Sequence, residues 1–110
     1  MNTKPCTLRC SRSAQNIRTA LHGWVITTGH NACEDDVTHA TDTQVRNLRK
    51  HGFTSFFQMY DGDDILCYSG YAKDDSAGID FEPLDKFGGP NAGCTEIYYR
   101  NPNTAAMERL

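Results

Sequence analysis

The chain has 110 residues, of which 38% are hydrophobic, and it carries 11 Lys and Arg against 14 Asp and Glu. This length predicts one domain spanning residues 1–110, because two halves of about 55 residues would each have a marginal core. The net charge of −3 argues against a typical basic nucleic-acid-binding domain. No apolar run approaches the roughly 18 residues that a transmembrane helix needs, and the polar, basic N-terminus lacks a secretory signal, so we expect a cytoplasmic protein.

The N-terminal third of the chain predicts one helix and one strand. Residues 13–22 show apolar side chains at helical spacing, with Ser13 as a cap and Gly23 just beyond the end. Residues 24–27 are aromatic and β-branched, which favours a strand. Residues 29–40 are polar and are expected to form a surface loop.

A second helix is predicted over residues 41–51. Thr41 and Gln44 have the spacing of a capping box at its start, and Gly52 follows its end. The last turns hold cations that oppose the negative end of the helix dipole: Arg46, Arg49, Lys50 and His51.

The clearest element is a β-hairpin. Residues 53–60 and 65–72 are rich in aromatic and apolar side chains, and residues 61–64 between them contain the Asp-Gly signal of a tight turn. Since a two-stranded ribbon is only marginally stable alone, it must pair with further strands. We expect it to be the central ribbon of a sheet, with residues 61–64 projecting into solvent because unpaired buried charges are costly.

The C-terminal half predicts one more strand. Residues 73–93 form a polar connection, which we expect to be pinned to the core by Ile79, Phe81, Leu84 and Phe87. Residues 94–100 predict the last strand, and the tail to Leu110 is expected to form one helical turn. The order of elements predicts an α+β fold, an antiparallel sheet of about four strands with two helices packed on one face.

The five cysteines and the absence of an export signal favour reduced thiols over a disulfide framework. The alternative is a small thiol or metal protein that uses Cys6, Cys10, His30 and Cys33, although zinc sites usually show two matching pairs of ligands. Cys67 and Cys94 are expected to be core residues. No nucleophile elbow, phosphate-binding loop or dinucleotide fingerprint is present, so we expect neither an enzyme nor a bound cofactor.

Charge is distributed unevenly along the chain. Residues 61–85 hold eight acidic residues and one lysine, whereas residues 1–32 hold four basic residues and no acid. Segregated charge of this kind steers charged partners, and tyrosines are enriched at protein interfaces. We therefore expect a non-catalytic protein that docks an acidic, tyrosine-bearing face on a basic surface of a host protein or nucleoprotein complex. The candidate partner-binding residues are Asp61, Asp63, Asp64, Asp74, Asp75, Tyr60 and Tyr68.

Two other interactions follow from the same charge map. A nucleic-acid-binding regulator would use the basic residues Arg9, Arg12, Arg18, Arg46, Arg49 and Lys50. The acidic C-terminal half argues against direct nucleic-acid binding, because it would repel phosphates. A homodimer is a further alternative, in which residues 1–32 of one copy pair with residues 61–85 of another.

One segment carries a resemblance. The hairpin sequence Met-Tyr-Asp-Gly-Asp-Asp-Ile-Leu-Cys-Tyr-Ser-Gly is followed by Phe-Gly-Gly-Pro-Asn-Ala-Gly-Cys-Thr at residues 87–95. Over roughly residues 53–99 the chain resembles small accessory proteins of bacteriophages, plasmids and other mobile elements, a group without an assigned activity. The resemblance implies a small cytoplasmic accessory protein without catalysis. By analogy with other short proteins of mobile elements, it implies an inhibitor of host defence of the anti-CRISPR type.

Overall fold

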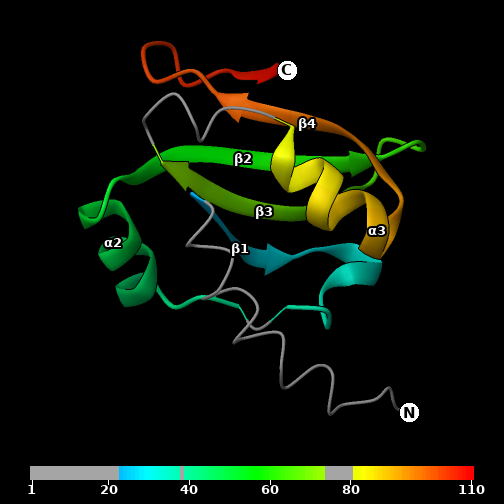
Figure 1. The fold of residues 1–110 in the computed structure, drawn as a ribbon, viewed down its shortest axis with the longest axis horizontal. Helices are drawn as coiled ribbons and strands as arrows, with labels where there is room; N and C mark the ends of the chain where they lie inside the picture. The colour runs from blue at the N-terminus through cyan, green and yellow to red at the C-terminus, as the bar shows by residue number, and fades with distance from the viewer. Residues whose placement is uncertain (1–22, 38, 74–80) are drawn as a thin grey trace.

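The computed structural model describes residues 23–37, 39–73 and 81–110, which form a five-stranded antiparallel sheet with helical segments beside it (Figure 1). The strands are β1 (Trp24–Gly29), β2 (Phe53–Asp61), β3 (Leu66–Lys73), β4 (Cys94–Arg100) and β5 (Met107–Arg109). Their spatial order is β1-β3-β2-β4-β5. The α+β class is confirmed, with five strands where about four were expected. The helix predicted over residues 13–22 lies outside the described residues.

The β2–β3 hairpin is the central ribbon of this sheet, as predicted. β3 pairs with β2 on one side and β1 on the other, and β2 also pairs with β4. Figure 1 shows the hairpin turn extending beyond the end of the β2 arrow. The turn is therefore far from the other end of β2, where α2 lies.

One face of the sheet carries the core. The largest fully buried side chains on the strands are Ile26, Phe57, Met59, Tyr68 and Ile97. A π-helical turn, η3 (Leu84–Gly88), and the short helix α3 (Gly89–Ala92) cover this face, and the Phe87 ring meets the Tyr68 ring edge-on at 4.9 Å between centroids. Figure 1 shows this helical segment lying in front of the sheet.

The helical segment over the core was predicted to be a polar connection, and that prediction was wrong. Leu84 and Phe87 are buried, as expected, but Phe81 is 47% exposed, and Ile79 lies outside the described residues. Gly88 explains the close approach, because a Cβ there would lie 2.6 Å from the Met59 sulfur. The glycines and the proline that suggested a loop thus allow a helix to press against β2 and β4.

The helix α2 (Asp42–Lys50) has the predicted capping box. The Gln44 backbone N–H donates to the Thr41 hydroxyl at 3.1 Å, and the Thr41 N–H donates to the Gln44 side chain at 2.8 Å. None of its residues is buried. Local signals therefore start and end this helix, which contributes no residue to the core.

The two remaining segments differ from expectation. The loop over residues 29–40 contains a short 3-10 helix, η2 (Asn31–Cys33), and it places Cys33 and Val37 in the core. The C-terminal tail forms β5 rather than a helical turn, because the Asn101 side chain accepts from the backbone N–H groups of residues 103 and 104 and turns the chain back along β4. Among the described residues, no helix combines the length and apolarity of a membrane span.

Candidate protein-binding surface

The hairpin tip has a fixed backbone shape that depends on Asp61. One carboxylate oxygen of Asp61 accepts from the backbone N–H of Asp63 at 2.8 Å and from that of Ile65 at 3.0 Å. The Asp61 N–H donates to the Ile65 carbonyl at 3.0 Å, which closes the turn. Asp61 is half-buried and structural, although the sequence had placed it among the partner-binding residues.

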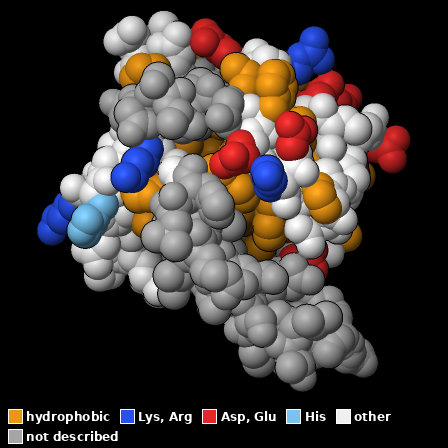
Figure 2. Space-filling view, in the orientation of Figure 1, with side chains coloured by type: hydrophobic (Ala, Val, Ile, Leu, Met, Phe, Trp, Pro, Cys, Tyr) orange, Lys and Arg blue, Asp and Glu red, His pale blue; other side chains and the backbone are white. Residues whose placement is uncertain are grey.

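The rest of the tip faces solvent, as predicted. Asp63 and Asp64 are exposed, and neither carboxylate bonds to another described residue. Ile65 is 45% exposed beside them. Figure 2 shows basic side chains and a histidine at the left, where α2 lies, and acidic side chains in the centre, at the top and on the right, with some basic side chains among them. The tip is thus an acidic projection with an apolar side chain.

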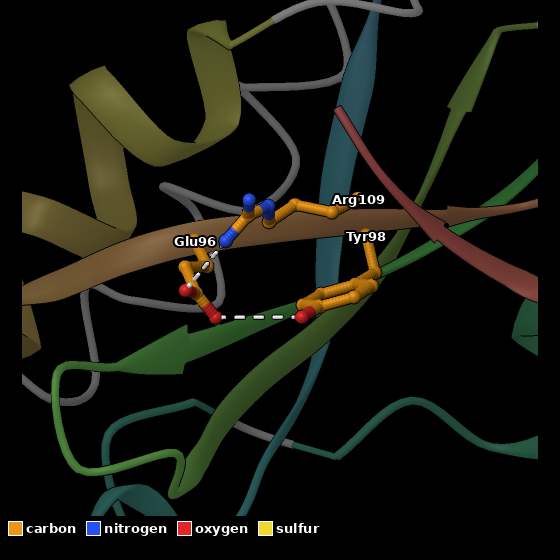
Figure 3. Close-up of polar contacts among 3 residues, drawn as sticks. All are labelled: Glu96, Tyr98 and Arg109. Atoms are coloured by element: carbon orange, nitrogen blue, oxygen red, sulfur yellow. Dashed lines mark hydrogen bonds and ion pairs between the residues drawn. The ribbon is translucent and has the colours of Figure 1, made fainter.

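A pair of tyrosines lies next to the tip on the sheet face opposite the core. The Tyr60 and Tyr98 rings meet edge-on, with 5.3 Å between centroids, and both residues are half-buried. Glu96 lies beside them and accepts a long hydrogen bond of 3.5 Å from the Tyr98 hydroxyl, and its other oxygen lies 3.1 Å from Arg109 of β5 (Figure 3). Tyr98 and Glu96 extend the candidate surface in a way that sequence reasoning missed, because only strand register brings β4 beside Tyr60.

Tyr68 does not lie on this surface, although the sequence placed it among the partner-binding residues. It is 0% exposed and lies in the core, so it has no surface to offer a partner. Its hydroxyl donates to Asp36 at 2.7 Å, and burial together with this bond raises the pKa of Tyr68. Because side chains alternate between the two faces of a strand, the sequence alone leaves the face of Tyr68 undetermined. The other two candidates, Asp74 and Asp75, lie outside the described residues.

The proposed thiol or metal site is not assembled in the part of the chain that the structure describes. Cys6 and Cys10 lie outside it, and among the described residues no three metal-ligating side chains gather. His30 points its Nε2 at the Ser69 hydroxyl, 2.7 Å away, and Cys33 is buried in the core.

Three buried thiols belong to the core cluster. Cys67, which was predicted to be a core residue, lies there with Cys33 and Cys94, and its thiol donates to the Ile65 carbonyl at 3.4 Å. Burial is the main cause that raises the pKa of Cys33 to about 11, and it raises the pKa of Cys94 as well. Nucleophilic and metal-binding thiols need the opposite shift, toward the thiolate. This cluster therefore packs the core and offers no activated nucleophile.

The His30–Ser69 contact pairs a potential base with a potential nucleophile, and no sequence motif pointed to it. Burial lowers the pKa of His30, and the neighbouring His39 adds to this shift. Ser69 is only 3% exposed, so its hydroxyl is covered. The contact ties the end of β1 to β3, together with the bond from the His30 N–H to the Cys67 carbonyl at 2.8 Å. Its role here is structural.

The basic residues of α2 lie at the other end of the central ribbon from the acidic tip. Arg46, Arg49 and Lys50 are all exposed, and β2 starts at Phe53 and ends at Asp61. The remaining basic candidates, Arg9, Arg12 and Arg18, lie outside the described residues. The sheet therefore separates charges of opposite sign along its strands.

Comparison of the chain with protein-family models, with curated proteins and with solved structures finds no match.

Proposed function

We propose that the chain is a non-catalytic accessory protein that binds another protein through its hairpin tip and the adjacent Tyr60–Tyr98 pair. The observation that carries this proposal is the rigid, exposed group of Asp63, Asp64 and Ile65. None of these three side chains is needed to close the turn, because the Asp61 carboxylate does that.

The chemistry of the tip defines the partner. Two carboxylates on a projecting turn attract a basic surface and accelerate encounter at low salt. Ile65 suits a small apolar pocket within that surface, and the tyrosine pair supplies the amphipathic rings that are enriched at binding hot spots. The partner is therefore a protein with Lys and Arg side chains around an apolar depression.

In its narrower form, the proposal names an inhibitor encoded by a mobile element that acts on a host nucleoprotein complex. Such a complex presents Lys and Arg side chains that contact phosphates. The carboxylates of the tip would occupy those side chains in place of nucleic acid. The resemblance over residues 53–99 supports this form of the proposal.

A charge-reversal experiment tests the proposal. A partner captured from a bacterial lysate is identified and purified, and its affinity is measured for the wild type and for an Asp63→Lys/Asp64→Lys variant. We expect the variant to lose at least about tenfold in affinity at low salt, and the loss to shrink as salt screens the charges.

The matched control is Asp42→Lys/Glu108→Lys, which makes the same change in net charge at two exposed acids in α2 and β5, away from the tip. Circular dichroism checks that both variants fold. Equal affinity of the tip variant and the wild type would refute the proposal, and so would equal losses in the tip variant and the control.

A further inference from the structure

The sheet face opposite the core has a second aromatic pair, at the end remote from the acidic tip. Phe56 of β2 and Tyr71 of β3 are register partners, and their rings lie 5.3 Å apart with an interplanar angle of 58°. Both residues are half-buried, so part of each ring faces solvent. The Arg100 guanidinium lies 4.9 Å from the centre of the Phe56 ring. We call Phe56, Tyr71 and Arg100 the aromatic platform.

Cations border this platform. The Lys73 ammonium, at the end of β3, lies 5.6 Å from the centre of the Phe53 ring. Among the described residues, neither Arg100 nor Lys73 forms an ion pair, whereas Arg109 is paired with Glu96. The α2 cations Arg49 and Lys50 precede β2 at the same end of the sheet. Among the described residues, the charges that border the platform are thus positive, opposite to those of the tip, and Asp74 and Asp75, which follow Lys73 in the sequence, lie outside these residues.

The distance between the two regions follows from strand geometry. Phe56 precedes Asp61 by five residues in β2, which corresponds to about 16 Å at the usual rise of a strand. This separation exceeds the Debye length of about 8–10 Å at physiological salt. The acidic tip therefore repels an anion at the platform only weakly, although the average charge of the chain argued against nucleic acid.

We propose that the aromatic platform binds single-stranded nucleic acid. Bases would stack on the exposed parts of the Phe56 and Tyr71 rings, and Arg100 and Lys73 would contact the flanking phosphates. An antiparallel sheet face with two or three aromatic side chains is a known geometry for stacking unpaired bases, and aromatic stacking tolerates any base sequence. Because Arg100 and Lys73 attract negative charge, the platform favours an anionic polymer over a neutral or basic peptide. This inference goes beyond the proposed function and does not depend on it.

Fluorescence anisotropy with a labelled oligothymidylate, at low salt and with the full chain, tests the inference. A Phe56→Leu/Tyr71→Leu variant keeps the apolar bulk but removes both rings, and we expect roughly a 5- to 100-fold loss of affinity. An Arg100→Gln variant should reduce the slope of log affinity against log salt by about 0.7, because one phosphate contact is lost. A duplex of the same length should bind more weakly than the single strand.

The matched control is Tyr98→Leu, which removes a ring from the same face at the acidic end and should leave oligothymidylate binding within about twofold. Absence of binding by the wild type at low salt would overturn the inference. Unchanged binding by Phe56→Leu/Tyr71→Leu would also overturn it and assign the interaction to basic residues elsewhere. The inference is also overturned if Tyr98→Leu loses as much oligothymidylate affinity as Phe56→Leu/Tyr71→Leu does. It is overturned as well if Phe56→Leu/Tyr71→Leu loses affinity only for a protein partner.

Each of the two proposals can be refuted independently of the other. The Asp63→Lys/Asp64→Lys variant should lose its protein partner and still bind oligothymidylate at least as well as the wild type. The Arg100→Gln variant alters no core residue, so it remains informative if the double leucine variant does not fold.

Discussion

Asp61 and Asp63 stand two residues apart in the same acidic turn, yet their carboxylates have different surroundings. The Asp61 side chain accepts two backbone N–H groups, whereas the Asp63 side chain faces solvent. A binding test that reverses the charge of all three tip aspartates would therefore combine the loss of partner contacts with the loss of the turn. Variants at Asp61 alone and at Asp63 alone separate the two effects.

We predict that Asp61→Ala lowers the free energy of unfolding by about 1–2 kcal/mol, because two backbone donors of the turn lose their charged acceptor. Asp63→Ala should change it by less than about 0.5 kcal/mol, as expected for an exposed side chain. Urea unfolding followed by circular dichroism measures both values. A loss for Asp63→Ala as large as that for Asp61→Ala would contradict the assignment of roles.

The tyrosines show what residue-level reasoning from the sequence can and cannot supply. Strand alternation correctly requires that some of them face away from the core, and Tyr60, Tyr71 and Tyr98 do. The phase of alternation within β3 was open, however, and the register that pairs Tyr68 with the buried Met59 sets it. Tyr68 consequently points into the core, where Asp36 meets its hydroxyl.

At the scale of elements, the close pairing of β1 with β3 depends on Gly70. A Cβ at this position would collide with the Val25 backbone carbonyl and would lie 2.7 Å from the edge of the Phe57 ring. A backbone carbonyl in a sheet cannot move aside as the end of a flexible side chain can. Gly70 therefore sets the distance between the edge strand and the hairpin.

We predict that Gly70→Ala lowers the free energy of unfolding by at least about 2 kcal/mol, through overpacking of the sheet and the core. The control is Gly62→Ala in the hairpin turn, where nothing lies within 4 Å of the added Cβ, and it should be nearly neutral. Thermal and urea unfolding measure both variants. A Gly70→Ala protein as stable as the wild type would show that β1 is not held in this register.

Elements with local signals were predictable from the sequence, and those that depend on packing were not. The capping box at Thr41 and the Asp-Gly turn act through neighbouring residues, so α2 and the hairpin were predicted close to their observed bounds. The segment from Leu84 to Ala92 contains glycines and a proline, which suggest a loop unless the facing strands are known. The three-residue strand β5 forms only because β4 offers it an edge.

At the scale of the whole molecule, the two ends of the sheet carry opposite charges, and its two edges are covered to different extents. The acidic tip lies at one end of the strands and the cations of α2, Lys73 and Arg100 at the other. At the β1 edge, the Thr27 carbonyl accepts from the Ala40 N–H at 3.0 Å, so a loop covers part of that edge. At the opposite edge, β5 is the one strand among the described residues that covers β4. Its residues are exposed or half-buried, and none belongs to the core cluster.

This arrangement predicts the effect of removing residues 101–110. The core should stay folded, because the deleted residues contribute no buried side chain and their ion pair between Arg109 and Glu96 is a surface pair worth about 0–1 kcal/mol. β4 would then present unpaired backbone groups, including the Ile97 carbonyl that now accepts from the Leu110 N–H at 3.0 Å. Exposed strand edges pair with other chains, so the truncated protein should self-associate more strongly than the full chain as its concentration rises. Light scattering over a concentration series measures this self-association. The control is Arg109→Ala, which removes the ion pair and keeps the strand.

Two outcomes would contradict the prediction. A truncated chain that scatters like the full chain at every concentration would show that β5 does not protect the β4 edge. A truncated chain that unfolds would show that residues 101–110 support the core.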